Sequence, residues 1–490
     1  MPKWPVISPK FFRPTRIMSI AGGVALSLVV SGCGLLSGDP PSGEYDGPEN
    51  IVLIVIDTLR WDRLEATRNG VAVMPQLRAY ADENWNFTRA ISPGSWTKPS
   101  MTSMFTSLYP EVHKVQFLVT NSDFDEPLMT DVLGDNVETL AMYMKGHGYN
   151  TAAVQASSVL KETGAEKGFD TYVFKRYPEF KANHVTDTAL EALADLEPPF
   201  FFYVHYLDPH AQYTPPEKYR EMFGPLPEIS EQDKELLKRW PNYYKDRVFY
   251  EFGLNQERAF GDLSSSARER MRMLYDGEAR FIDDEVGRLL KAFRSRYPKT
   301  FTIITADHGE ELWEHGSVGH VKTVFDEVVH VPLILGGPGL GASRIDPWVQ
   351  TLDILPTIAA RLGLEARPHW QGRSLLDWAV MDQDGSRAVF SHNRSSYKVI
   401  GMDQWAVYRG NFKFGDHVHA GEQYFFDLTT DPGETKGDGT VATERVAEMK
   451  ALLEAHRASN RSHAFHSEGE HEAHVDNELK ELIGALGYLE

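Results

Sequence analysis

The chain has 490 residues, of which 42% are hydrophobic and 24% are charged, a composition that supports a large folded core. Its formal net charge is −20 at neutral pH. A surface of that sign repels phosphates, which argues against a nucleic-acid partner. The sequence has one cysteine, so an intramolecular disulfide and a thiolate metal site are excluded.

The first residues have the pattern of an export signal. Four Lys or Arg residues precede an apolar stretch from Ile17 to Val30, and Ser31-Gly32-Cys33 follows. This resembles a bacterial lipoprotein signal over residues 1–32, with Cys33 becoming the lipid-modified residue. We therefore predict an exported protein, anchored through Cys33 to a bacterial membrane and facing the periplasm or the cell surface. A plain secretory signal and an uncleaved anchor are the alternatives.

The chain then alternates between apolar runs and helical patterns. Residues 33–49 are rich in Gly, Pro and Ser, which predicts a flexible tether. Apolar runs typical of parallel strands covered on both faces occur at 51–56, 152–154, 200–207, 301–305 and 331–335. Apolar residues at helical spacing occur at 74–83, 136–147 and 267–293. This alternation predicts an α/β domain over residues 50–376, with a mostly parallel central sheet flanked by helices.

Residues 213–266 interrupt the alternation. The stretch is rich in proline, charged and aromatic residues. It predicts a helical insertion that could cover the site and set specificity. A surface excursion with a small core of its own is an equally good interpretation.

The character of the chain changes again after residue 376. Short strand patterns separated by turns occur at 388–390, 405–408, 412–414 and 424–426. An amphipathic helix follows at 442–457, and a last helix is predicted at 477–486. Residues 377–490 are therefore predicted to form a subdomain with a small antiparallel sheet and a helix.

Two apolar runs end in residues that suit a metal ion. Asp57 follows the first run directly, and Asp307-His308-Gly309 follows the run at 301–305. Side chains at the carboxyl ends of parallel strands meet at one edge of a sheet. Oxygen and imidazole ligands there can converge on one divalent cation. Taken singly, Asp57 is equally a helix cap, and Asp-His-Gly is also a common turn.

Thr97 is the candidate nucleophile. It precedes Pro99, a residue typical of a first helical turn, and residues 100–108 have the pattern of a short helix. Thr97 would lie at the positive end of that helix, where an anion is favoured. A neighbouring cation would lower the pKa of its hydroxyl. An isolated Thr at this place would more simply be a helix cap.

Histidines in two further segments complete the candidate set. In residues 204–210, which include His205 and Asp208, the turn at Pro209 favours His210 as the residue that projects beyond the sheet. After Asp307-His308, the residues His315, His320 and Lys322 could grip an anionic substrate or protonate a leaving group. Taken singly, each of these is more often a solvated loop residue than a catalytic one.

Taken together, these residues resemble the sulfatase family of the alkaline phosphatase superfamily. The matching segments are Asn50–Arg60, Thr97–Ser100 with Thr106–His113, Gly148–Thr151 with Gly168–Asp170, Tyr203–His210, Asp307–Glu310, His315–Gly316, Gly319–His320, Val331–Leu333, Tyr424–Glu434 and Ile483–Leu489. The resemblance runs from about Asn50 to the end of the chain. As a set, the motifs are specific to this family.

The resemblance implies a site and a chemistry. The implied ligands of a divalent cation (Ca²⁺, Mn²⁺ or Zn²⁺) are Asp57, Thr97, Asp307 and His308. Thr97 would attack the transferred group in line, His210 would contact that group, and His320 or Lys322 would assist the leaving group. The fold implied is the α/β sulfatase fold with its small C-terminal sheet.

The chain also departs from the family pattern. Thr97 stands where sulfatases carry the Cys or Ser that becomes formylglycine, so the usual hydrate mechanism is excluded. Met101 replaces the following Arg, residues 156–158 replace a Lys and a His, and Thr58 replaces the second Asp of the metal site. With fewer hard ligands and His308 present, Mn²⁺ or Zn²⁺ suits the site as well as Ca²⁺.

The sequence therefore predicts a metal-dependent hydrolase of sulfate or phosphate esters, acting on a small molecule, glycan or lipid. The alternatives are a phosphodiesterase, a phosphonate hydrolase or a phospho-group transferase. A two-metal variant would place a second Zn²⁺ at Asp208, His210 and His320. A further alternative, motivated by the missing basic residues, is a non-catalytic lipoprotein that binds anionic glycans.

Overall fold

The computed structural model describes residues 49–117, 129–160, 163–176, 179–238, 263–378, 385–394, 402–436, 443–463 and 472–475. All of them belong to one compact unit, Pro40–Glu490. The predicted signal, the lipid-anchor site at Cys33 and the tether up to residue 48 lie outside the described residues. The predicted domain boundary near residue 376 stays a prediction. No helix within the described ranges is long and apolar enough to cross a membrane.

The centre of the molecule is a nine-stranded sheet. Eight strands follow one another in the order β13-β4-β12-β9-β1-β8-β6-β7, and β14 pairs with β4. Their bounds are β1 Asn50–Ile56, β4 Trp85–Ile91, β6 Asn150–Gln155, β7 Thr171–Phe174, β8 Phe200–Tyr206, β9 Thr300–Thr305, β12 His330–Gly336, β13 Ser343–Ile345 and β14 Val349–Gln350. The predicted mostly parallel sheet is confirmed, because β12 is the one strand of this sheet that runs against its neighbours.

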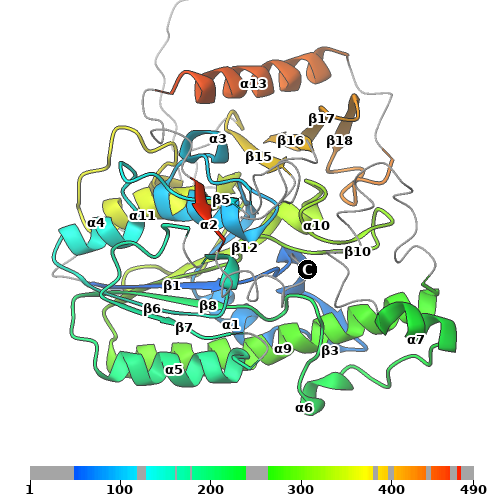
Figure 1. The fold of residues 1–490 in the computed structure, drawn as a ribbon, viewed down its shortest axis with the longest axis horizontal. Coiled ribbons are helices and arrows are strands. Elements are labelled where there is room, and N and C mark those ends of the chain that lie inside the picture. The colour runs from blue at the N-terminus through cyan, green and yellow to red at the C-terminus, as the bar shows by residue number, and fades with distance from the viewer. Residues whose placement is uncertain are drawn as a thin grey trace, which may run out of the picture. The chain divides into compact units, whose positions relative to one another are not determined.

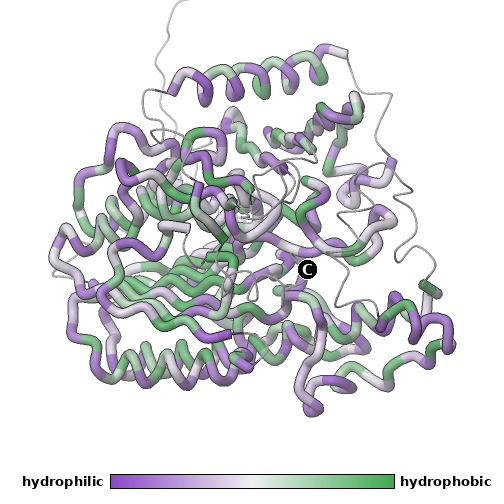
Figure 2. The backbone as a smooth tube through the Cα atoms, in the orientation of Figure 1, coloured by the Kyte–Doolittle hydropathy of each residue, from purple (hydrophilic) through white to green (hydrophobic). Residues whose placement is uncertain are grey.

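The middle strands hold the core. All seven residues of β1 are buried, and β1 pairs in parallel with β8 on one side and β9 on the other. These strands form the green hydrophobic centre of Figure 2. The apolar run at 331–335 looked like those of the parallel strands, yet it forms the antiparallel β12. A strand covered on both faces has the same apolar pattern in either direction.

Helices cover both faces of the sheet (Figure 1). On one face lie α1 Pro75–Glu83, α5 Ala182–Ala194 and α9 Ser265–Arg296. On the other lie α2 Thr97–Thr106, α4 Leu140–Gly146 and α11 Ile354–Arg361. The 32-residue α9 begins where the side chain of Ser264 accepts a hydrogen bond from the backbone N–H of Ala267, a typical N-cap.

Two helix predictions need correction. The helix predicted at 136–147 spans only Leu140–Gly146, because Thr139 caps it by accepting a hydrogen bond from Met142 N. The helix predicted at 100–108 begins earlier, at Thr97, and ends at Thr106. Proline is compatible with the first helical turn, so Pro99 lies inside the helix. Thr97 is therefore its first residue, and Trp96 is the N-cap.

The described part of the insertion packs against the main core. It contains α6 Glu217–Arg220 and α7 Glu231–Lys238. The side chains of Tyr213, Tyr219 and Phe223 are buried in the principal hydrophobic cluster, and the Tyr219 ring lies 5.2 Å from that of Phe281 in α9. This part of the insertion therefore has no separate core of its own. Residues 239–262, with the remaining aromatic residues, lie outside the described residues.

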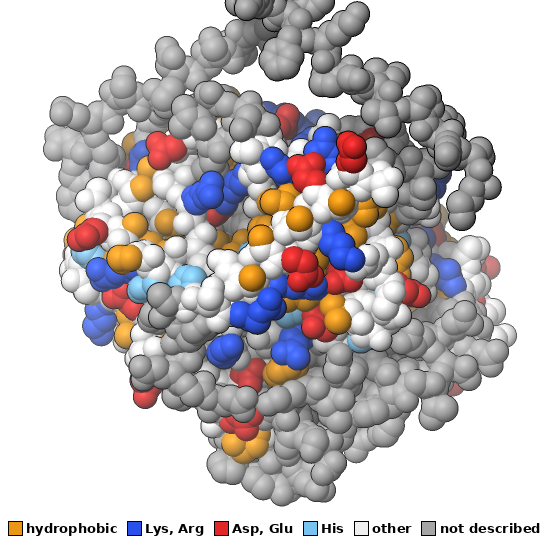
Figure 3. Space-filling model, turned by 90° about the horizontal axis from the view of Figure 1, so that it is seen from above, with side chains coloured by type: hydrophobic (Ala, Val, Ile, Leu, Met, Phe, Trp, Pro, Cys, Tyr) orange, Lys and Arg blue, Asp and Glu red, His pale blue; other side chains and the backbone are white. Residues whose placement is uncertain are grey.

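The predicted C-terminal sheet and helix are confirmed. Four antiparallel strands follow one another as β15 Ala388–Arg394, β16 Asp403–Arg409, β17 Phe412–His417 and β18 Glu422–Asp427. Helix α13, Thr443–Arg461, covers them through Met449 and Leu453, which pack with Trp405 and Phe414. Seen from above, this side of the molecule carries basic and acidic side chains close together (Figure 3). The helix predicted at 477–486 lies outside the described residues.

Short elements complete the described chain. They are η1 Trp61–Arg63, β2 Thr67–Arg68, β3 Val71–Ala72, α3 Pro110–His113, β5 Met129–Asp131, η2 Ser158–Leu160, β10 Glu311–Leu312, β11 Val318–Gly319, α10 Asp326–Val329, η4 Thr351–Asp353, η5 Leu375–Asp377 and β19 Glu472–His474. The elements η1, β10, β11 and α10 matter most for function. They follow β1 and β9 or precede β12, so they lie at the carboxyl end of the parallel strands.

Candidate active site

The ends of β1 and β9 deliver two carboxylates to one place. Asp57 directly follows β1, and its backbone N–H donates to the carbonyl of Tyr206 at 2.9 Å, continuing the pairing with β8. Asp307 follows β9 after Ala306. Because β1 and β9 are parallel neighbours in register, their ends meet at the same edge of the sheet. Both side chains are fully buried.

His308 completes a group that could hold a metal ion. Ligand atoms of Asp57, Asp307 and His308 all lie within 4.8 Å of one another. His308 Nε2 is 3.6 Å from Asp57 Oδ1 and 3.4 Å from Asp307 Oδ2. Atoms that share a cation at the usual ~2.0–2.2 Å bond lengths lie about that far apart. The predicted convergence of these three residues is therefore present in the structure.

The chemistry of these residues fits a divalent cation. Asp57 Oδ1 and Asp307 Oδ2 are buried and have no hydrogen-bond partner. Among the described residues, neither carboxylate forms an ion pair with Lys or Arg. Burial, and then the neighbouring Asp307, raise the pKa of Asp57 well above its ordinary value. Two buried carboxylates without a countercharge are costly, and a bound cation would remove that cost.

The histidine is also oriented for a metal. His308 Nδ1 lies 2.9 Å from the carbonyl oxygen of Gly309. When Nδ1–H donates to that carbonyl, Nε2 keeps its lone pair for the cation. Gly309 permits this arrangement because a Cβ at its position would lie 2.1 Å from the carbonyl oxygen of Glu327. The backbone could not approach so closely with any larger residue.

Thr97 lies beside this group. Its Oγ1 is 3.3 Å from His308 Nε2 and 3.4 Å from Asp57 Oδ2. As the first residue of the ten-residue α2, Thr97 lies in the positive field of the helix N-terminus. Its side chain is only 1% exposed, so water contributes little to the local dielectric. The structure thus brings the predicted nucleophile and the three predicted metal ligands together.

Backbone strain marks the same place. Thr58, directly after Asp57, has φ +56°, and Val321, between His320 and Lys322, has φ +73°. Both residues are β-branched, and such side chains seldom adopt positive φ. Strain of this kind persists where the surrounding structure enforces it, often at functional sites. Val321 is held by its N–H, which donates to Ser95 O at 3.1 Å, two residues before Thr97.

His320 and His210 line the group on one side. The ring of His320 lies 4.4 Å from that of His308 and 5.1 Å from that of His210. His320 Nδ1 is 3.2 Å from the buried carboxylate of Glu310, which orients the opposite nitrogen. Burial lowers the pKa of His210 to about 4, so this side chain is neutral at neutral pH. Both predicted catalytic histidines therefore lie at the site.

Lys322 and His315 have different surroundings. Lys322 Nζ donates to Ser317 Oγ at 3.0 Å. Burial, and then Asp57, raise the pKa of Glu310 well above its ordinary value, and the charge of Lys322 is one of the smaller influences that lower it. Lys322 is thus electrostatically linked to the site. His315 instead stacks on Phe325 at 3.7 Å and pairs with Glu327 at 3.3 Å. It is not a member of the Asp57 group; with Glu327 and Glu434 it belongs to a second group whose ligand atoms lie within 4.8 Å of one another.

The two-metal variant lacks geometric support. Asp208 Oδ2 accepts a hydrogen bond from Ala182 N at 2.9 Å, so Asp208 holds the first turn of α5. Asp208, His210 and His320 are not among the groups of described residues whose ligand atoms lie within 4.8 Å of one another. The Asp208 carboxylate is oriented toward α5 because it accepts the hydrogen bond from the backbone N–H of Ala182. The prediction of a second Zn²⁺ at these residues is wrong for this arrangement.

His205, which the sequence pattern favours less than His210, lies beside Asp57. It is fully buried on β8, and its Nε2 lies 3.5 Å from Asp57 Oδ2. Its Nδ1 is 2.6 Å from the hydroxyl of Tyr203, which lies two residues earlier on the same face of the strand. In the sequence, His205 could have been recognised as a candidate because it is an imidazole inside an otherwise apolar strand. Glu310, the partner of His320, was likewise not singled out.

Three comparisons define the class of the protein. The family model described as "Sulfatase" matches residues 49–364. A delta 4,5-hexuronate-2-O-sulfatase of Bacteroides thetaiotaomicron is 24% identical over 73% of this chain and 78% of its own length. Human iduronate 2-sulfatase is 24% identical over 70% of this chain and 74% of its own. The crystal structure of a phosphonate monoester hydrolase of Agrobacterium radiobacter superposes with a TM-score of 0.66 at 20% identity, covering 84% and 96% of the two chains.

The chain belongs to the sulfatase family, because the family model spans well over half of it. It is an enzyme of the hydrolase class, with the α/β fold and small C-terminal sheet of its structural neighbours.

Proposed function

We propose that the protein is a metal-dependent hydrolase of sulfate or phosphate esters with Thr97 as its nucleophile. The observation that carries the proposal is the position of Thr97 Oγ1, 3.3 Å from His308 Nε2 and 3.4 Å from Asp57 Oδ2. A threonine that only capped a helix would have no need of unpaired buried carboxylates beside it. Asp57, Asp307, His308 and Thr97 would hold the cation.

The chain's own residues provide the steps of the reaction. The cation, when bound, would lower the pKa of the Thr97 hydroxyl and neutralise charge on the transferred group. Asp57 Oδ2 is within reach of the hydroxyl proton. Thr97 Oγ1 then forms a bond to sulfur or phosphorus while the bond to the leaving oxygen breaks, in line. His320, oriented by Glu310, returns a proton to that oxygen.

The covalent intermediate must then be cleaved by water. A threonine ester has no second hydroxyl on the same carbon, so it cannot collapse by elimination as a formylglycine hydrate can. Water must attack the sulfur or phosphorus atom and release Thr97 unchanged. His210 and His320 lie on the side from which this water could be deprotonated.

A second candidate function is hydrolysis of phosphodiesters or phosphonate monoesters. Two observations favour it over sulfate hydrolysis. Thr97 cannot form formylglycine, and Met101, at the position of the family's arginine, is fully buried in the main hydrophobic cluster. The same site could also belong to a transferase. In that case an alcohol group of a lipid or glycan, instead of water, would attack the covalent intermediate and receive the phospho group.

We also propose that the enzyme is exported and anchored to a bacterial membrane through a lipid on Cys33. The support is the basic, apolar and small-residue pattern of residues 1–33. Metabolic labelling with a clickable fatty acid tests this, because label should enter the wild type and not a Cys33→Ala variant. Equal labelling of both would contradict the anchor.

A substrate screen tests the proposed reaction. Purified protein loaded with Mn²⁺, Zn²⁺ or Ca²⁺ is assayed against 4-nitrophenyl sulfate, phosphate, a phosphodiester and a phenylphosphonate ester. Release of nitrophenol that requires metal and disappears in Thr97→Ala supports the proposal, and the preferred ester decides between the two candidates. A protein that binds no metal and cleaves none of these esters would instead be the non-catalytic binder.

A further inference from the structure

The residue between the two candidate proton donors has an unfavourable backbone conformation. Val321 lies between His320 and Lys322, and its φ of +73° is one that β-branched residues seldom adopt. Such a conformation persists only where surrounding contacts enforce it. The N–H of Val321 donates to Ser95 O at 3.1 Å, which fixes one of its two backbone polar groups. Whatever holds the other group also sets the directions of His320 and Lys322.

The carbonyl of Val321 is held from the C-terminal subdomain. Asn393, near the end of β15, donates from Nδ2 to Val321 O at 2.8 Å. Because a carbonyl oxygen can only accept, the nitrogen of the Asn393 amide must face it. Asn393 is fully buried, its Nδ2 also contacts Met402 Sδ at 3.6 Å, and its Oδ1 has no hydrogen-bond partner among the described residues. Since sulfur is a weak acceptor, the bond to Val321 is the stronger of the two contacts.

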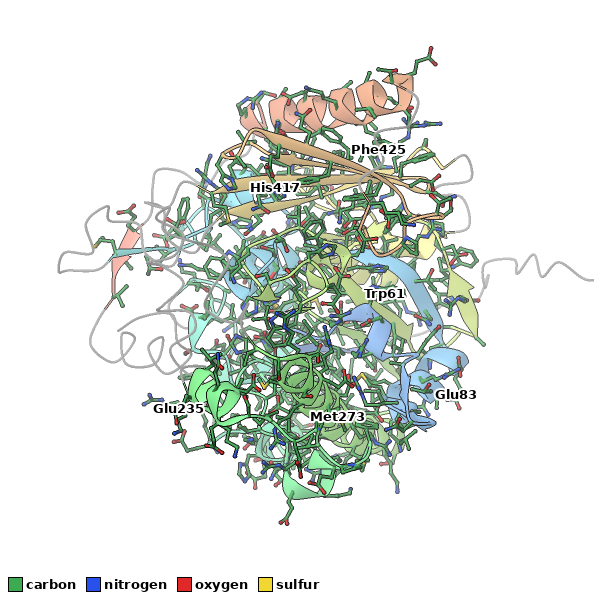
Figure 4. The ribbon with its side chains drawn as sticks, turned by 90° about the vertical axis from the view of Figure 1, so that its right-hand side faces the viewer. Trp61, Glu83, Glu235, Met273, His417 and Phe425 are labelled. Atoms are coloured by element: carbon green, nitrogen blue, oxygen red, sulfur yellow. The ribbon has the colours of Figure 1, made fainter. Side chains whose placement is uncertain are left out.

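The strand β15 is itself fixed against the main domain. The N–H of His392 donates to Pro93 O at 2.9 Å, in the segment between β4 and Thr97. In Figure 4 the C-terminal sheet, labelled at His417 and Phe425, lies between α13 and the main body of the molecule. The strand therefore contacts both the segment that leads to the nucleophile and the loop that carries the candidate proton donors.

The far end of the same loop is held by the subdomain as well. Lys413 Nζ donates to Val324 O at 2.8 Å. Glu434 Oε2 accepts from the N–H of Asp326 at 2.9 Å, where α10 begins. Lys413 and Glu434 are buried and pair with each other. Of these contacts from the subdomain, the one made by Asn393 lies nearest along the chain to the candidate proton donors.

We propose that Asn393 is a positioning residue for the departure of the leaving group. The inference rests on the proposed function. By holding Val321 O, Asn393 keeps the strained backbone in the conformation that directs His320, with Lys322 beside it, toward the leaving oxygen. The proton passes to that oxygen while its bond to sulfur or phosphorus breaks. A misplacement of about 1 Å costs such a step about 10²-fold in rate, so the C-terminal subdomain contributes to catalysis through this one amide.

The variant Asn393→Leu tests the proposal, because leucine is similar in size and cannot donate a hydrogen bond. Rates of the full-length enzyme are measured on the 4-nitrophenyl ester that the wild type prefers and on the corresponding phenyl ester. Phenolate is the poorer leaving group and depends more on the donated proton. Asn393→Leu should lower kcat/KM about 10²-fold for the phenyl ester and less than about tenfold for the nitrophenyl ester. If Asn393→Leu does not fold, Asn393→Ala takes its place.

The matched control is Asn460→Leu. Asn460 is also a buried asparagine of the C-terminal subdomain, and its amide bonds to Gln371 and Glu111 of the main domain. Among the described residues it makes no hydrogen bond to residues 318–324. Its substitution should therefore change the rates with the two esters by the same factor, whatever its effect on the melting temperature.

Hydrogen exchange tests the anchoring of Val321 without turnover. Mass spectrometry of the peptide that spans residues 318–324 reports the exchange of the Val321 N–H. This exchange should be at least about tenfold faster in Asn393→Leu than in the wild type, because loss of the bond to Val321 O loosens the loop. In Asn460→Leu the exchange should match that of the wild type.

Two results would overturn the proposal. One is that Asn393→Leu lowers the rates with both esters by the same factor. The other is that exchange in residues 318–324 is the same in Asn393→Leu and the wild type. Failure of the proposed function has a different signature, since the wild type would then cleave neither ester. In that case Asn393 would have only the structural role that hydrogen exchange reports.

Discussion

Two buried polar clusters of this enzyme differ in how their atoms are paired. The catalytic cluster consists of Asp57, Thr97, Asp307 and His308. The junction cluster consists of Glu111, His392, Asp403 and Asn460 and joins α3 to the C-terminal subdomain. Both are rich in carboxylates and imidazole, but the catalytic cluster is almost fully buried, whereas Glu111 and Asp403 of the junction cluster are partly exposed. In the first, one oxygen of each carboxylate has no hydrogen-bond partner.

In the junction cluster, both carboxylate oxygens of Glu111 and one of Asp403 have partners. Glu111 pairs with His392 through Oε1 and accepts from Asn460 Nδ2 through Oε2 at 2.8 Å. The other nitrogen of His392 lies 3.0 Å from Asp403 Oδ1, which also accepts from Trp405 Nε1. Burial alone would raise the pKa of Glu111, but His392 beside it lowers that pKa to about 2.

The comparison shows how to separate function from structure in a buried polar cluster. In the junction cluster the protein itself provides the countercharge, so the carboxylate stays ionised and the network stabilises the fold. In the catalytic cluster burial, and then the neighbouring Asp307, raise the pKa of Asp57 well above its ordinary value, although His308 lowers it in part. Among the described residues, no Lys or Arg pairs with Asp57. The missing charge must come from a ligand. The feature that indicates a cation site is that Asp57 and Asp307 place their unpaired oxygens beside His308.

The largest expected effect is on activity. Thr97→Ala should lower kcat/KM by at least about 10³-fold, because loss of a nucleophile removes the covalent route. Its melting temperature should stay near that of the wild type. Thr102→Ala is the matched control, since Thr102 is equally buried in α2 and donates only to the carbonyl of Lys98. If Thr97→Ala and Thr102→Ala had comparable activity, Thr97 would not be the nucleophile.

Metal removal should distinguish the two clusters directly. Chelation should lower the melting temperature of the wild type, because a bound cation stabilises only the folded state. In Asp307→Asn, which loses one ligand charge, the protein should retain far less metal by mass spectrometry and respond little to the chelator. Asp403→Asn, in the junction cluster, should keep the full chelator response. If chelation left the melting temperature of the wild type unchanged, that result would contradict a metal ion bound at Asp57.

A smaller effect is expected at His205. His205→Phe should weaken metal affinity about 10- to 100-fold, the usual cost of losing a group that orients a ligand. His205→Gln should restore part of the loss, because its amide can still donate toward Asp57 Oδ2, 3.5 Å from the native nitrogen. Competition with a fluorescent chelator measures both affinities. Equal affinities of wild type and His205→Phe would show that the imidazole has only a packing role.

The smallest effect should be confined to stability. Glu111 has a pKa lowered from 4.5 to about 2 in the folded protein, so its contribution is present above pH 4.5 and is lost as the pH falls toward 2. Glu111→Gln should therefore cost about 3 kcal/mol at pH 7, and less in acid. Denaturant titration at several pH values measures this, with the half-exposed Glu448→Gln as control. Metal content should not change.

Much of the catalytic cluster could be predicted from local patterns. Asp57 and Asp307 each come at the end of a run of buried apolar residues, and the ends of parallel strands converge. Pro99 indicated a helix start near Thr97. The resemblance in motifs then predicted that these segments meet. Thr97 lies within 3.4 Å of Asp57 and His308, as that prediction requires.

Other features could not be predicted from spacing. The run that became β12 has the same apolar pattern as a parallel strand, so its direction depended on pairing with β9 and β4. His205 lies beside Asp57 only because β1 and β8 pair in register, with Val55 opposite His205. Asp208, predicted as a ligand of a second metal, instead holds the first turn of α5.

Four strands of the central sheet, β4, β7, β13 and β14, were not predicted from the sequence. The sequence by itself did determine five of its strands, where Asp57 and Asp307 follow two of them and that a threonine stands at position 97. These are local properties, set by side-chain hydropathy and by the residues that begin and end each element. Only the tertiary structure decided which polar atoms find partners and which stay unpaired. That outcome depends on contacts between residues as far apart as Asp57 and His308, and hydrophobic packing of the whole sheet brings those residues together.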